Sequence, residues 1–338
     1  MYTIIGPDNR VRYGCIDEPV DFNYRDFRLL DFLGRETGRL RKRFAFHKFN
    51  YLGVITDRFI VGFAAVDLTY AHNVFAYLFD YAGGLLYEYD ALWPGNARLN
   101  FNTHPDEYAI DFRKGATRLR VEKSHARGEL SFDAMFQGRL RATGSAPYGL
   151  ESHRPLRVLN PSEPTRWTFT EKRAGMVPDL IRIELDGKPL PFDLSKTTLV
   201  YDWSGGYLRR RTDWFWAAFS GFRGRIPVGG NIATLVNESC FNENAFWIGD
   251  KRTRVRQCVF DFDLGDTGKP WRVGDEGGSV DMAFYPEGER SHVVNAMVVK
   301  TAFHQMIGSF RGTLRPEGGK ALKLDGVRGF TEYHRALW

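Results

Sequence analysis

The 338-residue chain has little cysteine and no apolar run long enough to cross a membrane. Its three cysteines, Cys15, Cys240 and Cys258, are few and odd in number, which excludes a disulfide framework. Met1 to Gly14 carries charged residues and lacks the apolar core of a signal peptide, and the apolar stretch from Phe59 to Val66 is too short to span a bilayer. We therefore expect a protein of the reducing cytoplasm.

Several short motifs of enzymes are missing too. The sequence contains no H-E-x-x-H or C-x-x-C spacing, and His292, His304 and His334 stand apart, so we expect no metal site. The glycine-rich segment 221–230 lacks the Lys followed by Ser or Thr of a phosphate-binding loop. No G-x-S-x-G nucleophile elbow is present either. We expect no cofactor.

Aromatic residues make up 15% of the chain, and it contains 35 glycines, a combination that favours sheets with many turns. The formal net charge is only +6. The densest cluster of basic residues in the sequence comprises Arg35, Arg39, Arg41, Lys42 and Arg43. A solvated helix or turn accounts for this cluster, so nucleic acid is not an expected partner, while a peripheral contact with an anionic membrane is left open.

Alternation of apolar and polar residues is the dominant local pattern. In the segment 129–136, Leu130, Phe132, Ala134 and Phe136 share one face, which is typical of a half-buried antiparallel strand. The same pattern recurs in 258–264 and 280–284. Long helical periodicity is scarce, and its best candidate, residues 25–43, is interrupted by two glycines. These patterns predict an all-β fold with few short helices.

Turn signals divide the chain further. Asp186-Gly187 and Gly249-Asp250 predict hairpins, because these residues tolerate positive φ. Proline and serine accumulate from Gly144 to Pro164, which we interpret as a linker or long crossover. We therefore predict two β-rich domains, residues 1–150 and 165–338, each about the size of a small barrel.

The segment 201–216 contains three of the eight tryptophans. Trp214 and Trp216 share one face of a strand and could form an apolar wall, which Trp203 could close from the preceding turn. Asp202 and Asp213 each adjoin a tryptophan, and a carboxyl group against such a wall has a raised pKa and can donate a proton. The alternative is that the tryptophans fill a core and Asp202 caps a turn.

Further polar residues near this segment are candidates for the site. Arg210 lies in a run of three arginines and could orient a polar group or simply be solvated. The residues Asn237, Glu238, Asn242, Glu243 and Asn244 could form a hydrogen-bonding patch at a cavity mouth, with Glu243 as acid or base, or a structural turn. Glu332-Tyr-His334 and His304 could add polar atoms to a site, although the pattern favours structural histidines.

Several strings are specific in combination, namely 13–19, 23–27, Thr56-Asp57, Gly205-Gly-Tyr207, 212–216, 242–245 and 286–290. Through them nearly the whole chain resembles the uncharacterised bacterial family called domain of unknown function 2804. Asp202-Trp203 followed by Trp214-x-Trp216 is also similar to lipocalin-like double-barrel proteins such as carotenoid hydratases and tocopherol cyclases. That likeness implies two antiparallel calycin-type barrels or curled sheets packed together, around an apolar pocket for an isoprenoid or other lipid-like molecule.

In such enzymes an acidic side chain protonates a carbon–carbon double bond, and aromatic faces shelter the carbocation. The resemblance assigns the acid to Asp202 and the binding wall to Trp203, Trp214 and Trp216. From the residues themselves, Asp213 and Glu243 are further candidates for the acid, Tyr207 for the wall, and Arg210 and Asn244 for the polar end. The expected partner is thus a small hydrophobic molecule, which undergoes hydration, cyclisation or isomerisation. The alternatives are a non-catalytic lipid carrier or sensor and a sugar-acting enzyme with two carboxyl groups in one cleft.

Overall fold

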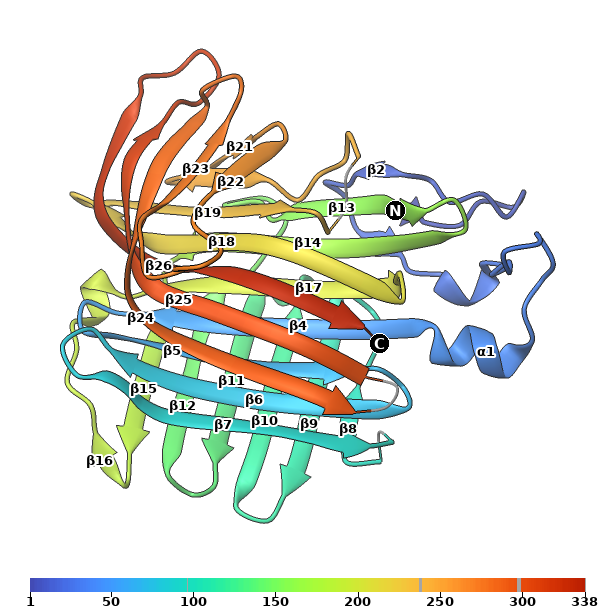
Figure 1. Cartoon of the computed structure of the whole chain (residues 1–338), viewed down its shortest axis with the longest axis horizontal. Coiled ribbons are helices and arrows are strands. Elements are labelled where there is room, and N and C mark those ends of the chain that lie inside the picture. Colours follow the sequence, from blue (N-terminus) through green and yellow to red (C-terminus); the bar gives the residue numbers. More distant parts are fainter. Residues whose placement is uncertain (96, 237–238, 297–298, 338) are drawn as a thin grey trace.

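The computed structural model describes residues 1–95, 97–236, 239–296 and 299–337, and nearly all of its regular elements are β-strands (Figure 1). Its helices are η1 (Tyr24–Asp26), α1 (Arg39–Phe44) and η2 (Leu194–Lys196). Gly34, at φ +77°, and Gly38, the N-cap of α1, interrupt the helical stretch as predicted. None of the helices in the described ranges has the length and hydrophobicity needed to span a bilayer.

Three antiparallel sheets contain almost all the strands. In the order of hydrogen bonding, the seven-stranded sheet comprises β16 (Lys188–Pro189), β15 (Leu180–Leu185), β12 (Leu140–Pro147), β11 (Glu129–Phe136), β10 (Thr117–Ser124), β9 (Glu107–Lys114) and β8 (Leu99–Phe101). The eight-stranded sheet comprises β2 (Gly14–Cys15), β13 (Leu156–Glu163), β14 (Arg166–Met176), β17 (Thr198–Tyr207), β4 (Phe46–Ile55), β5 (Phe59–Asp67), β6 (Ala71–Asp80) and β7 (Gly84–Pro94).

The nine-stranded sheet comprises β21 (Lys251–Arg254), β20 (Ala245–Ile248), β19 (Ile226–Thr234), β18 (Arg211–Arg223), β26 (Leu322–Leu337), β25 (Val299–Leu314), β24 (Val280–Ala296), β23 (Trp271–Asp275) and β22 (Cys258–Asp261). A short parallel pair, β1 (Tyr2–Thr3) and β3 (Val20–Asp21), completes the strands of the described residues. The predicted all-β fold of curled, packed antiparallel sheets is therefore confirmed.

The eight-stranded sheet is the middle layer. One face packs on the seven-stranded sheet, whose strands run steeply across it in Figure 1, and Phe63 of β5 contacts Phe132 and Phe136 of β11. The other face packs on the nine-stranded sheet, where Tyr51 of β4 contacts Trp216 and Phe330. The nine-stranded sheet curls round a core of its own. Because both faces of the middle sheet are covered, charged residues of its strands are buried too.

Local predictions of strands and turns agree with the structure. Every second residue of β11 is buried, as its alternation indicates. Asp186 and Gly187 occupy a two-residue turn at φ +51° and +75°, between the paired residues Leu185 and Lys188. The second predicted hairpin is also present, with Gly249 at φ +58°. Leu264, predicted to share the buried face of its strand, is exposed because β22 ends at Asp261.

Strand pairing groups the chain differently from the predicted division at 150–165. That segment carries the chain from β12 in the seven-stranded sheet to β13 in the eight-stranded sheet, as a crossover would. Strands β14 and β17 then add to the same middle sheet as β4–β7. Sheet membership changes to the nine-stranded sheet only after residue 207. We propose that any boundary between folding units lies at 208–210.

Two glycine backbones approach closely between the middle and nine-stranded sheets. A Cβ on Gly229 of β19 would lie 2.3 Å from the backbone nitrogen of Gly175 on β14. Gly229→Ala is therefore expected to lower the free energy of unfolding by about 1–3 kcal/mol, because backbone cannot move aside as a flexible side chain can. Urea denaturation measures this, with Gly149→Ala as the control, since a Cβ there meets nothing within 4 Å. Equal stability of the two variants would contradict the proposed contact.

Candidate functional site

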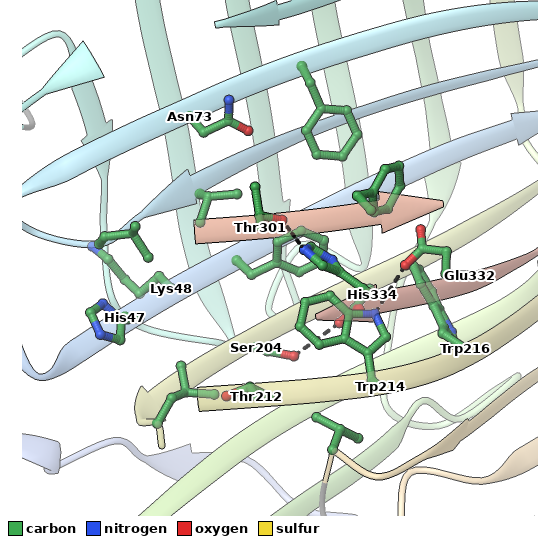
Figure 2. Close-up of a pocket in the computed structure, with 18 of the residues that line it drawn as sticks. His47, Lys48, Asn73, Ser204, Thr212, Trp214, Trp216, Thr301, Glu332 and His334 are labelled. Carbon is green, nitrogen blue, oxygen red and sulfur yellow. Dashed lines mark hydrogen bonds between the residues drawn. The ribbon is translucent and has the colours of Figure 1, made fainter. Parts of the chain in front are cut away.

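A cavity of about 220 Å³ lies between the middle sheet and the nine-stranded sheet (Figure 2). Most of its exposed wall consists of apolar atoms. Its polar side chains include His47, Lys48, Asn73, Asp90, Lys172, Asp202, Ser204, Glu243, Arg290, Glu332 and His334, and its apolar ones Phe49, Phe75, Leu208, Trp214, Trp216, Val294 and Phe303. This cavity is called the pocket below.

Alternation along β17 decides which predicted residues reach the pocket. Asp202 and Ser204 point into it, whereas Trp203 points to the opposite face of the middle sheet, against Phe22 and Phe169. Tyr207 lies on that opposite face as well, in the core between the middle and seven-stranded sheets. The prediction that these two rings line the pocket is therefore corrected, because consecutive residues of a strand face opposite ways.

Strand β18 supplies the aromatic wall. Trp214 and Trp216 line the pocket from this strand, and the indole N–H of Trp216 donates to Asn231 Oδ1 at 2.7 Å. Asp213, which directly precedes Trp214, faces away and pairs with Arg211 near the surface at 2.8 Å. Arg210 is exposed in the turn before β18. Neither Asp213 nor Arg210 is among the residues that line the pocket, so their predicted positions there are corrected.

The loop before β20 contributes Val236 and one of its predicted polar side chains to the pocket. Glu243 lines it, whereas Asn244 is buried behind it and fixes the loop, accepting from the Ala233 N–H at 2.7 Å and donating to the Arg256 carbonyl at 3.1 Å. Asn244 therefore has the structural role that we weighed as the alternative. Asn237 and Glu238 lie outside the described residues.

Lys172, Asp202 and Glu243 form a buried charged group at one side of the pocket. The ammonium group of Lys172 on β14 contacts Asp202 Oδ2 and lies 3.2 Å from Glu243 Oε2. Burial raises the pKa of Asp202, although the charge of Lys172 opposes this shift. Burial also disfavours the Lys172 ammonium, but the two carboxylates outweigh it and raise the Lys172 pKa. The lysine of this group therefore remains charged.

Glu332 on β26 is a carboxyl group of a different kind. Its Oε2 accepts from the Trp214 indole N–H at 3.2 Å (Figure 2). Its Oε1 accepts from the Gln305 amide at 2.7 Å. Burial raises the pKa of Glu332 to about 7. Among the described residues no Lys or Arg forms a salt bridge with it, since Arg290 pairs with Glu88 instead. Glu332 is thus a pocket carboxyl group held near the balance between its neutral and charged forms.

Two histidines of the pocket, His47 and His334, are neutral at physiological pH. Burial lowers the pKa of His334 to about 3, and its Nε2 lies 2.5 Å from the Thr301 hydroxyl. The His334 ring lies 4.0 Å from the Trp214 ring. Burial also lowers the pKa of His47 to about 4. These rings therefore add apolar surface and hydrogen-bonding atoms to the wall, and no positive charge.

A second buried polar cluster lies on the opposite face of the middle sheet. Asp106, His125 and Glu171 could each offer one atom to a metal ion, since these atoms lie within 4.8 Å of one another. However, Lys123 Nζ lies 2.6 Å from Glu171 Oε1, and Arg157 contacts both carboxylates. Two cations already neutralise the two acids, so the donor set does not fit a divalent ion.

Comparisons with known proteins place the chain in a family without an assigned activity. Residues 26–338 match the family described as "Domain of unknown function (DUF2804)", and the chain belongs to that family. No curated protein matches it. Among solved structures, kievitone hydratase from Nectria haematococca is similar at 9% sequence identity, with a TM-score of 0.39 over 86% of this chain and 88% of that one.

Proposed function

We propose that this protein binds a mainly apolar small molecule in the pocket and performs acid chemistry on it without a cofactor, with Glu332 as the proton donor. The observation that carries this proposal is a carboxyl group with a pKa of about 7, hydrogen-bonded to an indole in an apolar wall. A donor of that pKa is protonated in a useful fraction near neutral pH and can still release its proton.

The proposed first step is proton transfer from the Glu332 carboxyl group to a carbon–carbon double bond. The π electrons form the new C–H bond, and the adjacent carbon becomes a cation that the faces of Trp214 and Trp216 can stabilise. In hydration, water adds to this cation and its surplus proton returns to the Glu332 carboxylate. Cyclisation and isomerisation share the first step and end when a carbon next to the cation loses a proton to the Glu332 carboxylate, which restores the acid. Lys172 and its carboxylates would orient a polar end of the substrate.

Asp202, the acid assigned from sequence, suits this role less well. Lys172 contacts its carboxylate directly and stabilises the charged form. Glu332 has no such partner among the described residues, and the residue is only 5% exposed. A simple carrier needs no acid of this kind, and holding one in an apolar wall costs stability. A carboxyl group inside the cavity therefore favours the enzyme over the carrier.

Occupation of the pocket can be tested with retinol, an apolar molecule that quenches tryptophan emission by energy transfer. Val294→Trp is expected to weaken retinol binding by at least about tenfold, because residue 294 lines the pocket and an indole would fill it. Val293→Trp is the matched control, since its side chain is 70% exposed on the other face of β24. Equal retinol affinity of the two variants would exclude the pocket as the binding site. Mass spectrometry of molecules extracted from the purified protein then identifies the natural ligand.

A further inference from the structure

Residues 28–44, here called the arm, combine exposed apolar side chains with concentrated positive charge. Phe32 is fully exposed at the tip of a turn, and Leu33, Leu40 and Phe44 are 69%, 71% and 45% exposed. The arm also carries six basic residues, Arg28, Arg35, Arg39, Arg41, Lys42 and Arg43, and only two acidic ones, Asp31 and Glu36. It therefore holds a large part of the net positive charge of the chain.

The charge of the arm is poorly neutralised by its own fold. Arg35 pairs with Asp31 at 3.1 Å, but among the described residues Arg39, Arg41 and Arg43 have no acidic partner within salt-bridge distance. The apolar tip does not pack on the rest of the protein. Asp31 accepts from the Leu33 N–H and fixes the turn, and the side chains of Phe32 and Leu33 project outward. Neither feature contributes to the packing of the sheets.

The arm lies next to the pocket. It runs through α1 directly into β4, whose first residues His47 and Lys48 line the pocket. The ring of Phe44 lies 6.4 Å from that of Tyr70, which in turn lies 6.0 Å from the His47 ring. Figure 1 places α1 at the same end of the sheets as the end of β26, which carries His334.

We propose that the arm docks on the surface of an anionic membrane, with Phe32 and Leu33 inserted below the headgroups and the arginines on lipid phosphates. The exposed apolar turn and the basic residues together favour a membrane as the partner. A nucleic acid could bind the basic residues through its phosphates, but it offers no apolar layer for Phe32 and Leu33. This inference extends the proposed function: a docked arm would place the pocket beside the layer in which an apolar substrate dissolves.

Sedimentation with vesicles tests the docking. The full chain is expected to bind vesicles of phosphatidylcholine with 30% phosphatidylglycerol at least about tenfold more tightly than vesicles of phosphatidylcholine alone, and to be released by 0.5 M NaCl. Phe32→Ser/Leu33→Ser should lose about tenfold in binding to the anionic vesicles, since the insertion is removed. Val259→Ser/Leu264→Ser is the control, because these side chains are 68% and 64% exposed elsewhere.

Charge is tested separately with Arg39→Ala/Arg41→Ala/Arg43→Ala. The control is Arg315→Ala/Lys320→Ala/Lys323→Ala, whose exposed residues lie in the β25–β26 turn and at the start of β26. The proposal is overturned if the control triple variant loses as much vesicle binding as the arm triple variant, or if the wild type binds neither kind of vesicle. Binding to a 20-base-pair DNA duplex in place of vesicles would overturn it too. Retinol binding in solution by Phe32→Ser/Leu33→Ser should equal that of the wild type, so failure of docking is distinguishable from failure of the pocket.

Discussion

Glu332→Gln is expected to lower turnover of the molecule bound in the pocket by about 10²- to 10⁴-fold and to leave its affinity nearly unchanged. Glutamine has the shape of glutamate and can still accept from the Trp214 indole, but it cannot donate an acidic proton. With the wild type, kcat/KM should fall as the pH rises above about 7, because the carboxyl group then loses its proton. The measurement is a pH profile on the molecule that co-purifies with the protein.

Glu88→Gln is the matched control for this variant. Glu88 accepts from the Arg290 guanidinium at 3.0 Å, and Arg290 is linked to Glu332 through Gln305. Glu88 itself does not line the pocket. Its replacement should leave turnover within a few-fold of the wild type. Similar losses of turnover in Glu88→Gln and Glu332→Gln would mean that these hydrogen-bonded side chains only support the fold of the pocket. Glu332 would then not be the proton donor.

Stability measurements test the Glu332 pKa without a substrate. Its folded pKa of about 7 exceeds the ordinary value of 4.5, so the folded state holds an extra proton between these limits. The associated stability is fully present below pH 4.5 and is lost as the pH rises through 7, which amounts to roughly 3 kcal/mol. Glutamine does not titrate. Urea denaturation should therefore show the stability of Glu332→Gln rising relative to wild type by this amount between pH 4.5 and 8.

The comparison must be made between the two proteins at each pH. Burial lowers the pKa of His47 and His153 to about 4 and that of His334 to about 3. These histidines change the free energy of unfolding in the opposite direction. The stability that they contribute is present above the ordinary pKa of 6.5 and is lost as the pH falls toward 4. They contribute equally to both proteins and cancel in the difference. Parallel pH dependences of wild type and variant would contradict a raised Glu332 pKa.

The sequence identified the chemistry of the pocket better than its geometry. Asp202, Trp214, Trp216 and Glu243 were all singled out, and all four line it. Trp203 was placed on the wall because it was expected to lie in a turn, whereas β17 continues through Tyr207 and turns alternate residues to opposite faces. Where a strand starts and ends therefore decided which side chain of a neighbouring pair reaches the cavity.

Glu332 was recognised from sequence only as a source of polar atoms. Its role depends on Trp214 and Gln305, which approach it from β18 and β25. Pairing across more than a hundred residues leaves no local signal in one sequence. A period of two assigns residues to two faces of a strand, but it does not say which face of a three-layer molecule borders a cavity.

The same physical reason limits the prediction of the fold. Half-buried strands such as β11 alternate and were found, and the hairpin turns had their own residue signals. The middle sheet joins β4 to β17, with Asn50 opposite Trp203, and nothing local marks that pairing. Proline and serine at 144–164 mark a crossover between two sheets, which resembles a linker in composition.

Glu171→Gln is expected to destabilise the protein by about 3–5 kcal/mol. Glu171 lies on β14 beside Lys172 but faces the opposite side, where Lys123 Nζ at 2.6 Å, the Tyr148 hydroxyl at 2.6 Å and Arg157 Nε at 3.0 Å surround its fully buried carboxylate. Burial alone would raise the pKa of Glu171, but these cations outweigh it and hold the pKa well below its usual range. Removing the negative charge leaves two buried cations with only Asp106 to compensate them.

Urea denaturation at pH 7 measures this loss, and two further variants separate its cause. Glu122→Gln on β10 of the facing sheet, next to Lys123, removes a partly exposed partner of Arg120 and should cause no measurable loss. Lys123→Met/Glu171→Leu removes both charges of the buried pair and should be more stable than Glu171→Gln, because no uncompensated ammonium remains. If the double variant is instead less stable than Glu171→Gln, the cluster stabilises the fold by its net attraction, and the cost of an unpaired buried charge is not the cause.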